Sequence, residues 1–133
     1  LSYRGTAYHG WQTQKNALSV QTVLENAFQL IFDEKISVTG AGRTDTGVHA
    51  GYFVAHFDSE NFIDPLNSVY RLNGILPPDI TVFSIREMVT TAHARFDAIS
   101  RTYKYLFCRK KNVFAQELSA LIYGEIDLSL IHI

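Results

Sequence analysis

The sequence predicts an α+β domain in which an antiparallel sheet carries both helices on one face. Two segments, residues 20–32 and 66–73, have the capping residues or the apolar spacing of short helices. Segments rich in β-branched and aromatic residues precede, separate and follow them. The predicted order is therefore β-α-β-β-α-β plus one extra strand, which is the ferredoxin-like arrangement. The other face of such a sheet is free for a partner.

The first half of the chain contains the first predicted strands and the first helix. Residues 1–5 are expected to form a strand, and Ser19 is placed to cap the helix that follows. The apolar residues that recur at helical spacing in this helix are Val20, Val23, Leu24, Ala27, Phe28 and Ile31. Residues 36–41 and 51–58 are then predicted to be two strands joined by a glycine-rich loop.

Turn-forming residues bound the second helix and the later strands. Asp64 followed by Pro65 provides an N-cap and a first-turn proline, so a short helix is expected over residues 66–73. Strands are predicted at residues 80–89 and 99–109 because both segments are rich in β-branched or aromatic residues. The residues expected to share one face of the last strand are Arg101, Tyr103, Tyr105 and Phe107.

Composition indicates one globular domain that holds no metal. The chain has 133 residues, 47% of them hydrophobic, which is enough for one core. Its lone Cys108 cannot form an internal disulfide, and the five histidines show no zinc-binding spacing, so we expect a cytoplasmic protein without structural metal. No apolar run approaches the ~20 residues of a membrane span. Residues 116–123 are compatible with helix or strand, and the apolar tail at residues 128–133 is expected to favour association.

Basic residues are concentrated in one part of the chain although the net charge is −1. Half of the twelve lysines and arginines lie within residues 95–111; they are Arg95, Arg101, Lys104, Arg109, Lys110 and Lys111. Aromatic residues alternate with them, a pattern that suits an RNA backbone with bases stacked nearby. A solvated strand face has the same pattern, so charge alone does not decide between these interpretations.

The segment T-G-A-G-R-T-D-T-G-V-H-A-G, residues 39–51, is the strongest candidate for a functional site. It holds four of the eight glycines around Arg43, Thr44 and Asp45. Glycines allow a sharp turn and a close approach to a ligand, and a guanidinium two residues away can hold a carboxylate ionised. An exposed, oriented Asp45 is therefore expected. Because Asp and Gly are also common turn formers, a plain connecting loop is the alternative.

The string A-G-R-T-D-T-G-V-H-A resembles the signature of the TruA family of tRNA pseudouridine synthases. Further segments resemble the same family in the matching order: Y-R-G-T-A-Y-H-G-W-Q at residues 3–12, V-Q-T-V-L-E at residues 20–25, and H-A-R-F-D-A-I-S-R-T-Y-K-Y at residues 93–105. Arg4 departs from the family, which usually has an acidic residue there.

Family members carry a second domain that nothing in this chain resembles. The resemblance therefore implies that residues 1–111 form an N-terminal domain with the catalytic aspartate. Residues 112–133 would then begin the connection to a missing C-terminal domain. The resemblance to the family also implies a homodimer for the full-length protein.

The resemblance implies isomerisation of uridine to pseudouridine in the anticodon stem-loop of tRNA, without a cofactor. Asp45 would be the catalytic carboxylate, Tyr103 would stack on the extruded uracil, and Arg43 would contact the RNA or hold Asp45 ionised. The residues expected to bind the RNA backbone are Arg95, Arg101 and Lys104. The alternative roles are a core position for Tyr103 and a structural salt bridge for Arg43.

A non-catalytic RNA-binding domain of the same fold is the rival function. It explains the basic residues, but not why Gly, Arg and Asp are concentrated in a separate loop. Nucleotide binding by a glycine loop fits less well, because Asp45 stands where the third glycine of G-x-G-x-x-G would be and no Walker lysine is present.

Overall fold

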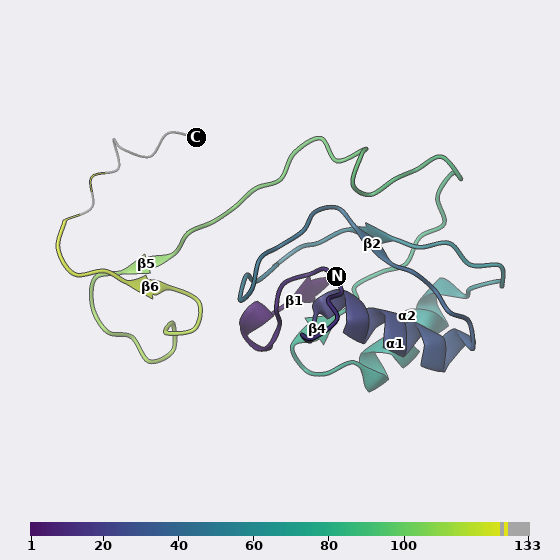
Figure 1. Cartoon of the computed structure of the whole chain (residues 1–133), viewed down its shortest axis with the longest axis horizontal. Helices are drawn as coiled ribbons and strands as arrows, with labels where there is room; N and C mark the ends of the chain where they lie inside the picture. The colour runs from purple at the N-terminus through teal and green to yellow at the C-terminus, as the bar shows by residue number, and fades with distance from the viewer. Residues whose placement is uncertain (126, 128–133) are drawn as a thin grey trace. The chain divides into compact units, whose positions relative to one another are not determined.

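The computed structural model describes residues 1–125 and 127, which divide into two compact units. The first unit is Leu1–Ile99 and the second begins at Ser100. The elements of the first unit, in chain order, are β1 (Ser2–Tyr3), the 3-10 turn η1 (Gly5–Ala7), α1 (Val20–Phe32), β2 (Thr39–Gly40), β3 (Ala55–His56), α2 (Pro65–Ile75) and β4 (Ile80–Thr81) (Figure 1). This is the predicted β-α-β-β-α-β order.

The strands of the first unit form two antiparallel pairs, and backbone hydrogen bonds connect one pair to the other. β1 pairs with β4, and β2 pairs with β3. The chain just before β3 also lies against β1, because Tyr3 and Ala50 exchange two backbone hydrogen bonds of 2.9 Å and Phe53 N–H donates to the Leu1 carbonyl at 2.8 Å. β1 therefore lies between β4 and the segment that leads into β3, as a ferredoxin-like sheet requires.

Both helices are capped by the residues that the sequence predicts, although α2 begins at Pro65, one residue earlier than expected. The Ser19 hydroxyl accepts a hydrogen bond from the Thr22 amide at 3.2 Å and caps α1. The Asp64 carboxylate accepts from the Leu66 amide at 3.1 Å and caps α2. α2 ends at Ile75 rather than at residue 73, and its cap Leu76 is extended because the next residue is a proline.

The core of the first unit lies between the helices and the strands. Its buried hydrophobic residues are Tyr3, Tyr8, Trp11, Val20, Leu24, Ala27, Phe28, Ile36, Val38, Leu72, Leu76, Ile80 and Val82. In Figure 1 α1 and α2 lie next to each other, below β2. Leu24 and Leu72, one from each helix, are essentially inaccessible, and each such leucine contributes roughly 1.5–3 kcal/mol of burial free energy.

The later strands are shorter than predicted. Of residues 80–89 only Ile80–Thr81 is a strand, and residues 86–91 are exposed, so no strand among residues 1–125 and 127 covers them. Of residues 99–109 only β5 (Phe107–Cys108) is a strand, and it pairs in parallel with β6 (Ala120–Leu121) in the second unit. The alternation at residues 101–107 does not produce one buried face, because all of these residues are exposed.

The segment over residues 116–123, which was compatible with helix or strand, contributes the two residues of β6. The apolar tail at residues 128–133 lies outside the described residues. Within the described part of the chain, neither helix has the length and apolar character needed to cross a membrane.

Candidate active site

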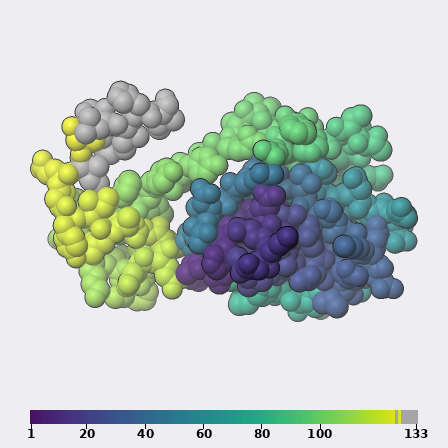
Figure 2. Space-filling model, viewed as in Figure 1, coloured from purple at the N-terminus to yellow at the C-terminus, as the bar shows by residue number. Residues whose placement is uncertain are grey.

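The glycine-rich loop between β2 and β3 is held against the first loop of the chain, which is residues 4–19 between β1 and α1. The Trp11 amide donates to the Thr44 carbonyl at 3.1 Å, and the Gly47 amide donates to the Tyr8 carbonyl at 3.2 Å. Figure 2 shows the purple N-terminal segment beside blue to teal parts of the chain. These bonds fix the loop on both sides of Asp45.

Two glycines of the first loop make this close approach possible. Gly10 has a φ of +82°, and a Cβ there would overlap the Thr44 carbonyl oxygen. A Cβ at Gly5 would overlap the Val48 carbonyl oxygen. Side chains at these positions would therefore separate the two loops, which explains why glycine is needed at both.

The first loop is itself anchored to the sheet. The buried Tyr8 donates its hydroxyl hydrogen to the Asp79 carboxylate, just before β4, at 2.7 Å. Burial and this carboxylate raise the pKa of the Tyr8 phenol above its ordinary value. The Gly5 amide donates to Nδ1 of His49 at 3.0 Å, so His49 has a structural contact. The loop around Asp45 therefore rests on a fixed support.

Asp45 itself is exposed, and its backbone carbonyl accepts a 3.2 Å hydrogen bond from the Val48 amide in a tight turn. Its carboxylate has no hydrogen-bond or ion-pair partner among residues 1–125 and 127, and the same holds for the exposed guanidinium of Arg43. The alternative role of Arg43, a structural salt bridge within the loop, is thus not formed with Asp45. Both are available to a ligand.

The segment containing Arg95 is attached to β3. The Ala94 amide donates to Nδ1 of His56 at 3.1 Å, and the His93 ring packs between the His56 ring and the ring of Phe96, with centroids 4.5 Å and 4.1 Å away. The His93 amide donates to the Asp97 carboxylate at 2.7 Å. This leaves the Arg95 side chain exposed, in the same unit as Asp45.

The other predicted RNA-contacting residues belong to the second unit. Arg101, Tyr103 and Lys104 lie in the exposed segment before β5. Tyr103 is 61% exposed, so it is not a core aromatic of this unit. Trp11, by contrast, is 2% exposed and packs on Phe53 with ring centroids 4.4 Å apart, which makes it a packing residue.

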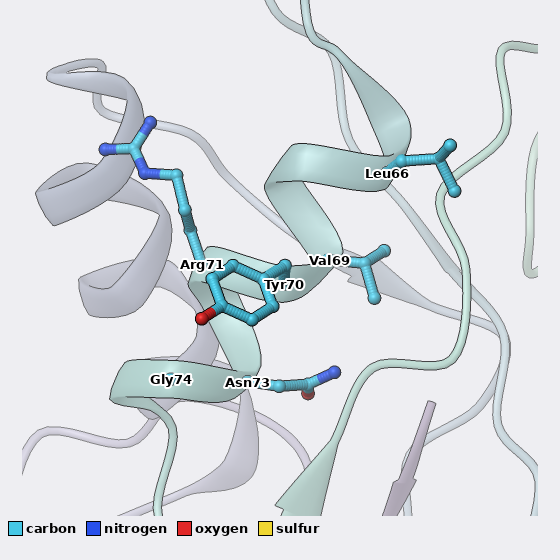
Figure 3. A pocket seen from close by; sticks show the side chains of 6 residues that line it. All are labelled: Leu66, Val69, Tyr70, Arg71, Asn73 and Gly74. Carbon is cyan, nitrogen blue, oxygen red and sulfur yellow. The ribbon is translucent and has the colours of Figure 1, made fainter.

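Two surface hollows lie away from the glycine-rich loop. One lies on the surface of α2, where Arg71 extends toward α1 and its guanidinium donates to the Ile31 carbonyl at 3.1 Å (Figure 3). The residues that line it are Leu66, Val69, Tyr70, Arg71, Asn73 and Gly74. The other lies in the second unit, near Cys108 and Lys110.

This arrangement presents the unpaired Asp45 carboxylate to a ligand on a rigid loop, with the Arg43 guanidinium two residues away. Within the described residues, no group of three His, Cys, Asp or Glu side chains could hold a metal ion. The Asp45 carboxylate is chemically capable of nucleophilic attack, proton transfer, or stabilisation of a nearby positive charge.

Comparison with known proteins shows the family to which the chain with this loop belongs. The model of a family described as tRNA pseudouridine synthase matches residues 1–97. The chain belongs to this family. Residues 1–97 include the glycine-rich loop, the first loop and the segment around Arg95, so the resemblance found in the sequence is confirmed.

Individual relatives agree with the family. The chain is 47% identical over 127 residues to tRNA pseudouridine synthase A of Bacteroides thetaiotaomicron, covering 96% of this chain and 47% of that relative. It is 45% identical over 128 residues to tRNA pseudouridine synthase A of Parabacteroides distasonis, covering 96% and 51%. For the protein of the same name in Exiguobacterium sibiricum the identity is 38% over 133 residues. The chain spans about half the length of these curated relatives.

Sequence reasoning missed one contact of the site. The hydroxyl of Tyr3, on β1, is 2.8 Å from the hydroxyl of Thr44, although the two residues are 41 positions apart. No local pattern indicates such a pair. The only available signal is that both residues lie in segments that resemble the family.

Proposed function

We propose that this protein isomerises uridine to pseudouridine in tRNA, with Asp45 as the catalytic carboxylate. The observation that carries the proposal is the position of Asp45: exposed, unpaired within the described residues, and held on a loop that two backbone hydrogen bonds fix to the first loop. Membership of the tRNA pseudouridine synthase family supplies the reaction.

The isomerisation needs a carboxylate that is ionised. The bond between N1 of uracil and C1′ of the ribose breaks, the base rotates, and C5 bonds to C1′; the C5 proton is lost and N1 gains a proton. A carboxylate can assist by attacking the sugar or the base, or by stabilising cationic character at C1′, as carboxylates do in glycoside hydrolysis. Exposure to solvent keeps the Asp45 carboxylate accessible to an extruded nucleotide.

Arg43 and Tyr103 are proposed to hold the substrate. The Arg43 guanidinium is exposed on the same loop as Asp45 and suits a phosphate near the extruded nucleotide. The exposed ring of Tyr103 is proposed to stack on the uracil. Arg95, Arg101 and Lys104, all exposed, are proposed to bind the backbone of the anticodon stem-loop.

The whole protein is proposed to be a cytoplasmic homodimer that works without a cofactor. Residues 1–111 would be its N-terminal domain and residues 112–133 the start of a connection to a second domain. The relatives named above, which are about twice as long as this chain, support a second domain.

Replacement of Asp45 with Asn tests the catalytic role. The amide is nearly isosteric but has neither the charge nor the nucleophilicity, so pseudouridine formation should vanish while folding and tRNA affinity persist. Tritium release from C5-labelled uridine in tRNA would measure turnover by the protein as its gene encodes it. Asp58→Asn makes the same change at another exposed aspartate and should keep activity. Normal tritium release by folded Asp45→Asn would refute the assignment.

The same assay separates this function from an RNA-binding domain without chemistry. That rival is favoured by the exposure of residues 101–107, where basic and aromatic side chains alternate. It predicts tRNA binding by the unaltered protein with no tritium release at all.

A further inference from the structure

We propose that Tyr3 is a positioning residue for the reaction, acting on Asp45 through Thr44; this rests on the proposed function of Asp45. The hydroxyls of Tyr3 and Thr44 are 2.8 Å apart, which is a normal hydrogen-bond distance. Thr44 directly precedes Asp45, so a contact that fixes Thr44 also restricts where the Asp45 carboxylate points.

Tyr3 is a rigid point of attachment. Its backbone is bonded to Ala50 on one side and pairs with Ile80 of β4 on the other. Its ring is 3% exposed and packs against the rings of Trp11 and Phe53, with centroids 6.0 Å and 5.6 Å away. The phenol oxygen is therefore held by both the sheet and the core.

Thr44 is restrained at two of its atoms. Its hydroxyl contacts Tyr3, and its carbonyl oxygen accepts the 3.1 Å hydrogen bond from the Trp11 amide. The Thr44 carbonyl and the Asp45 amide belong to one planar peptide group. Fixing Thr44 at both atoms therefore sets the orientation of that plane, from which the Asp45 side chain projects.

The hydroxyl of Tyr3 is separable from its core role. A phenylalanine ring would fill the same space between Trp11 and Phe53, and Thr44 is only partly buried, so water can replace the lost hydrogen bond. Because Tyr3 is buried, its hydroxyl is not placed to bind RNA. Loss of the hydroxyl should consequently affect the rate of the chemical step and not substrate affinity.

The test measures kcat and KM for tRNA in Tyr3→Phe, Thr44→Val and the double variant of the protein as its gene encodes it. Each single change should lower kcat roughly tenfold, less than the ~100-fold that a 1 Å misplacement can cost, with KM unchanged. The double variant should be no slower than either single one, because both remove the same contact. Thr44→Ser keeps the hydroxyl and should restore most of kcat.

The controls separate this inference from the proposed function. Tyr70→Phe removes a hydroxyl from the exposed face of α2 and should leave kcat unchanged. If Asp45→Asn abolishes turnover but Tyr3→Phe keeps full kcat, the positioning role is wrong and the proposed function stands. If Asp45→Asn stays active, both fail. Should Tyr3→Phe not fold, the comparison of Thr44→Val with Thr44→Ser decides, and equal rates for those two overturn the proposal.

Discussion

Replacing Gly10 with alanine should destabilise the fold. The φ of +82° at this position costs an L-residue roughly 1–2 kcal/mol. The new Cβ would also meet the Thr44 carbonyl oxygen, and the movement needed to relieve that overlap breaks the Trp11 to Thr44 hydrogen bond, for a further loss of about 0.5–1.5 kcal/mol. The expected total is about 1.5–3.5 kcal/mol.

Urea unfolding and thermal melts would measure this loss. For a unit of this size, about 1.5–3.5 kcal/mol corresponds to a fall in Tm of about 6–28 °C. Two other glycines provide matched controls. Gly47 has a φ of +79° but open space around its Cβ, so Gly47→Ala should show the conformational cost alone. Gly74 lies in α2 with open space, so Gly74→Ala should be neutral or stabilising. A Gly10→Ala protein as stable as Gly74→Ala would refute the proposed close contact of the two loops.

Two further predictions concern charge. Hydrogen bonds, the largest from the Ser59 hydroxyl, lower the pKa of Glu34, so its contribution to stability should be present at neutral pH and lost as the pH falls below its ordinary value of 4.5. Urea unfolding from about pH 3 to pH 7 should show a difference between wild type and Glu34→Gln that shrinks with acid, and a constant difference would contradict this. Charge reversal at Arg101 and Lys104 should weaken tRNA binding and flatten its salt dependence, measured by filter binding. Lys35→Glu makes the same change elsewhere on the surface, and an equal effect there would move the RNA surface away from residues 101–104.

The helices could be predicted from sequence because their signals are local. Ser19 and Asp64 cap helices that begin one residue later, so neighbouring residues carry the whole signal. The glycine-rich loop was also recognisable, since its residues are contiguous. The resemblance of this loop to a known family then indicated Asp45 as the catalytic carboxylate.

The extent of the strands could not be predicted, because pairing depends on residues far away in the sequence. Residues 82–89 have the composition of a strand, but the ladder with β1 ends at Thr81. The alternation at residues 101–107 was typical of a half-buried strand, yet no described residue covers either face. The contact between Tyr3 and Thr44 is of the same kind, since it exists only once β1 and the loop have been brought together.

The packing of the first loop on the glycine-rich loop limits how far the family signature can be transplanted. Residues 39–51 contain Asp45 and Arg43, but the atoms that shape this stretch belong to Tyr3, Tyr8 and Trp11. Grafted alone onto an unrelated scaffold, the stretch would be a flexible, glycine-rich connector in which the Asp45 carboxylate has no fixed orientation. A designer who wished to move this site would have to carry the N-terminal strand and loop along with it.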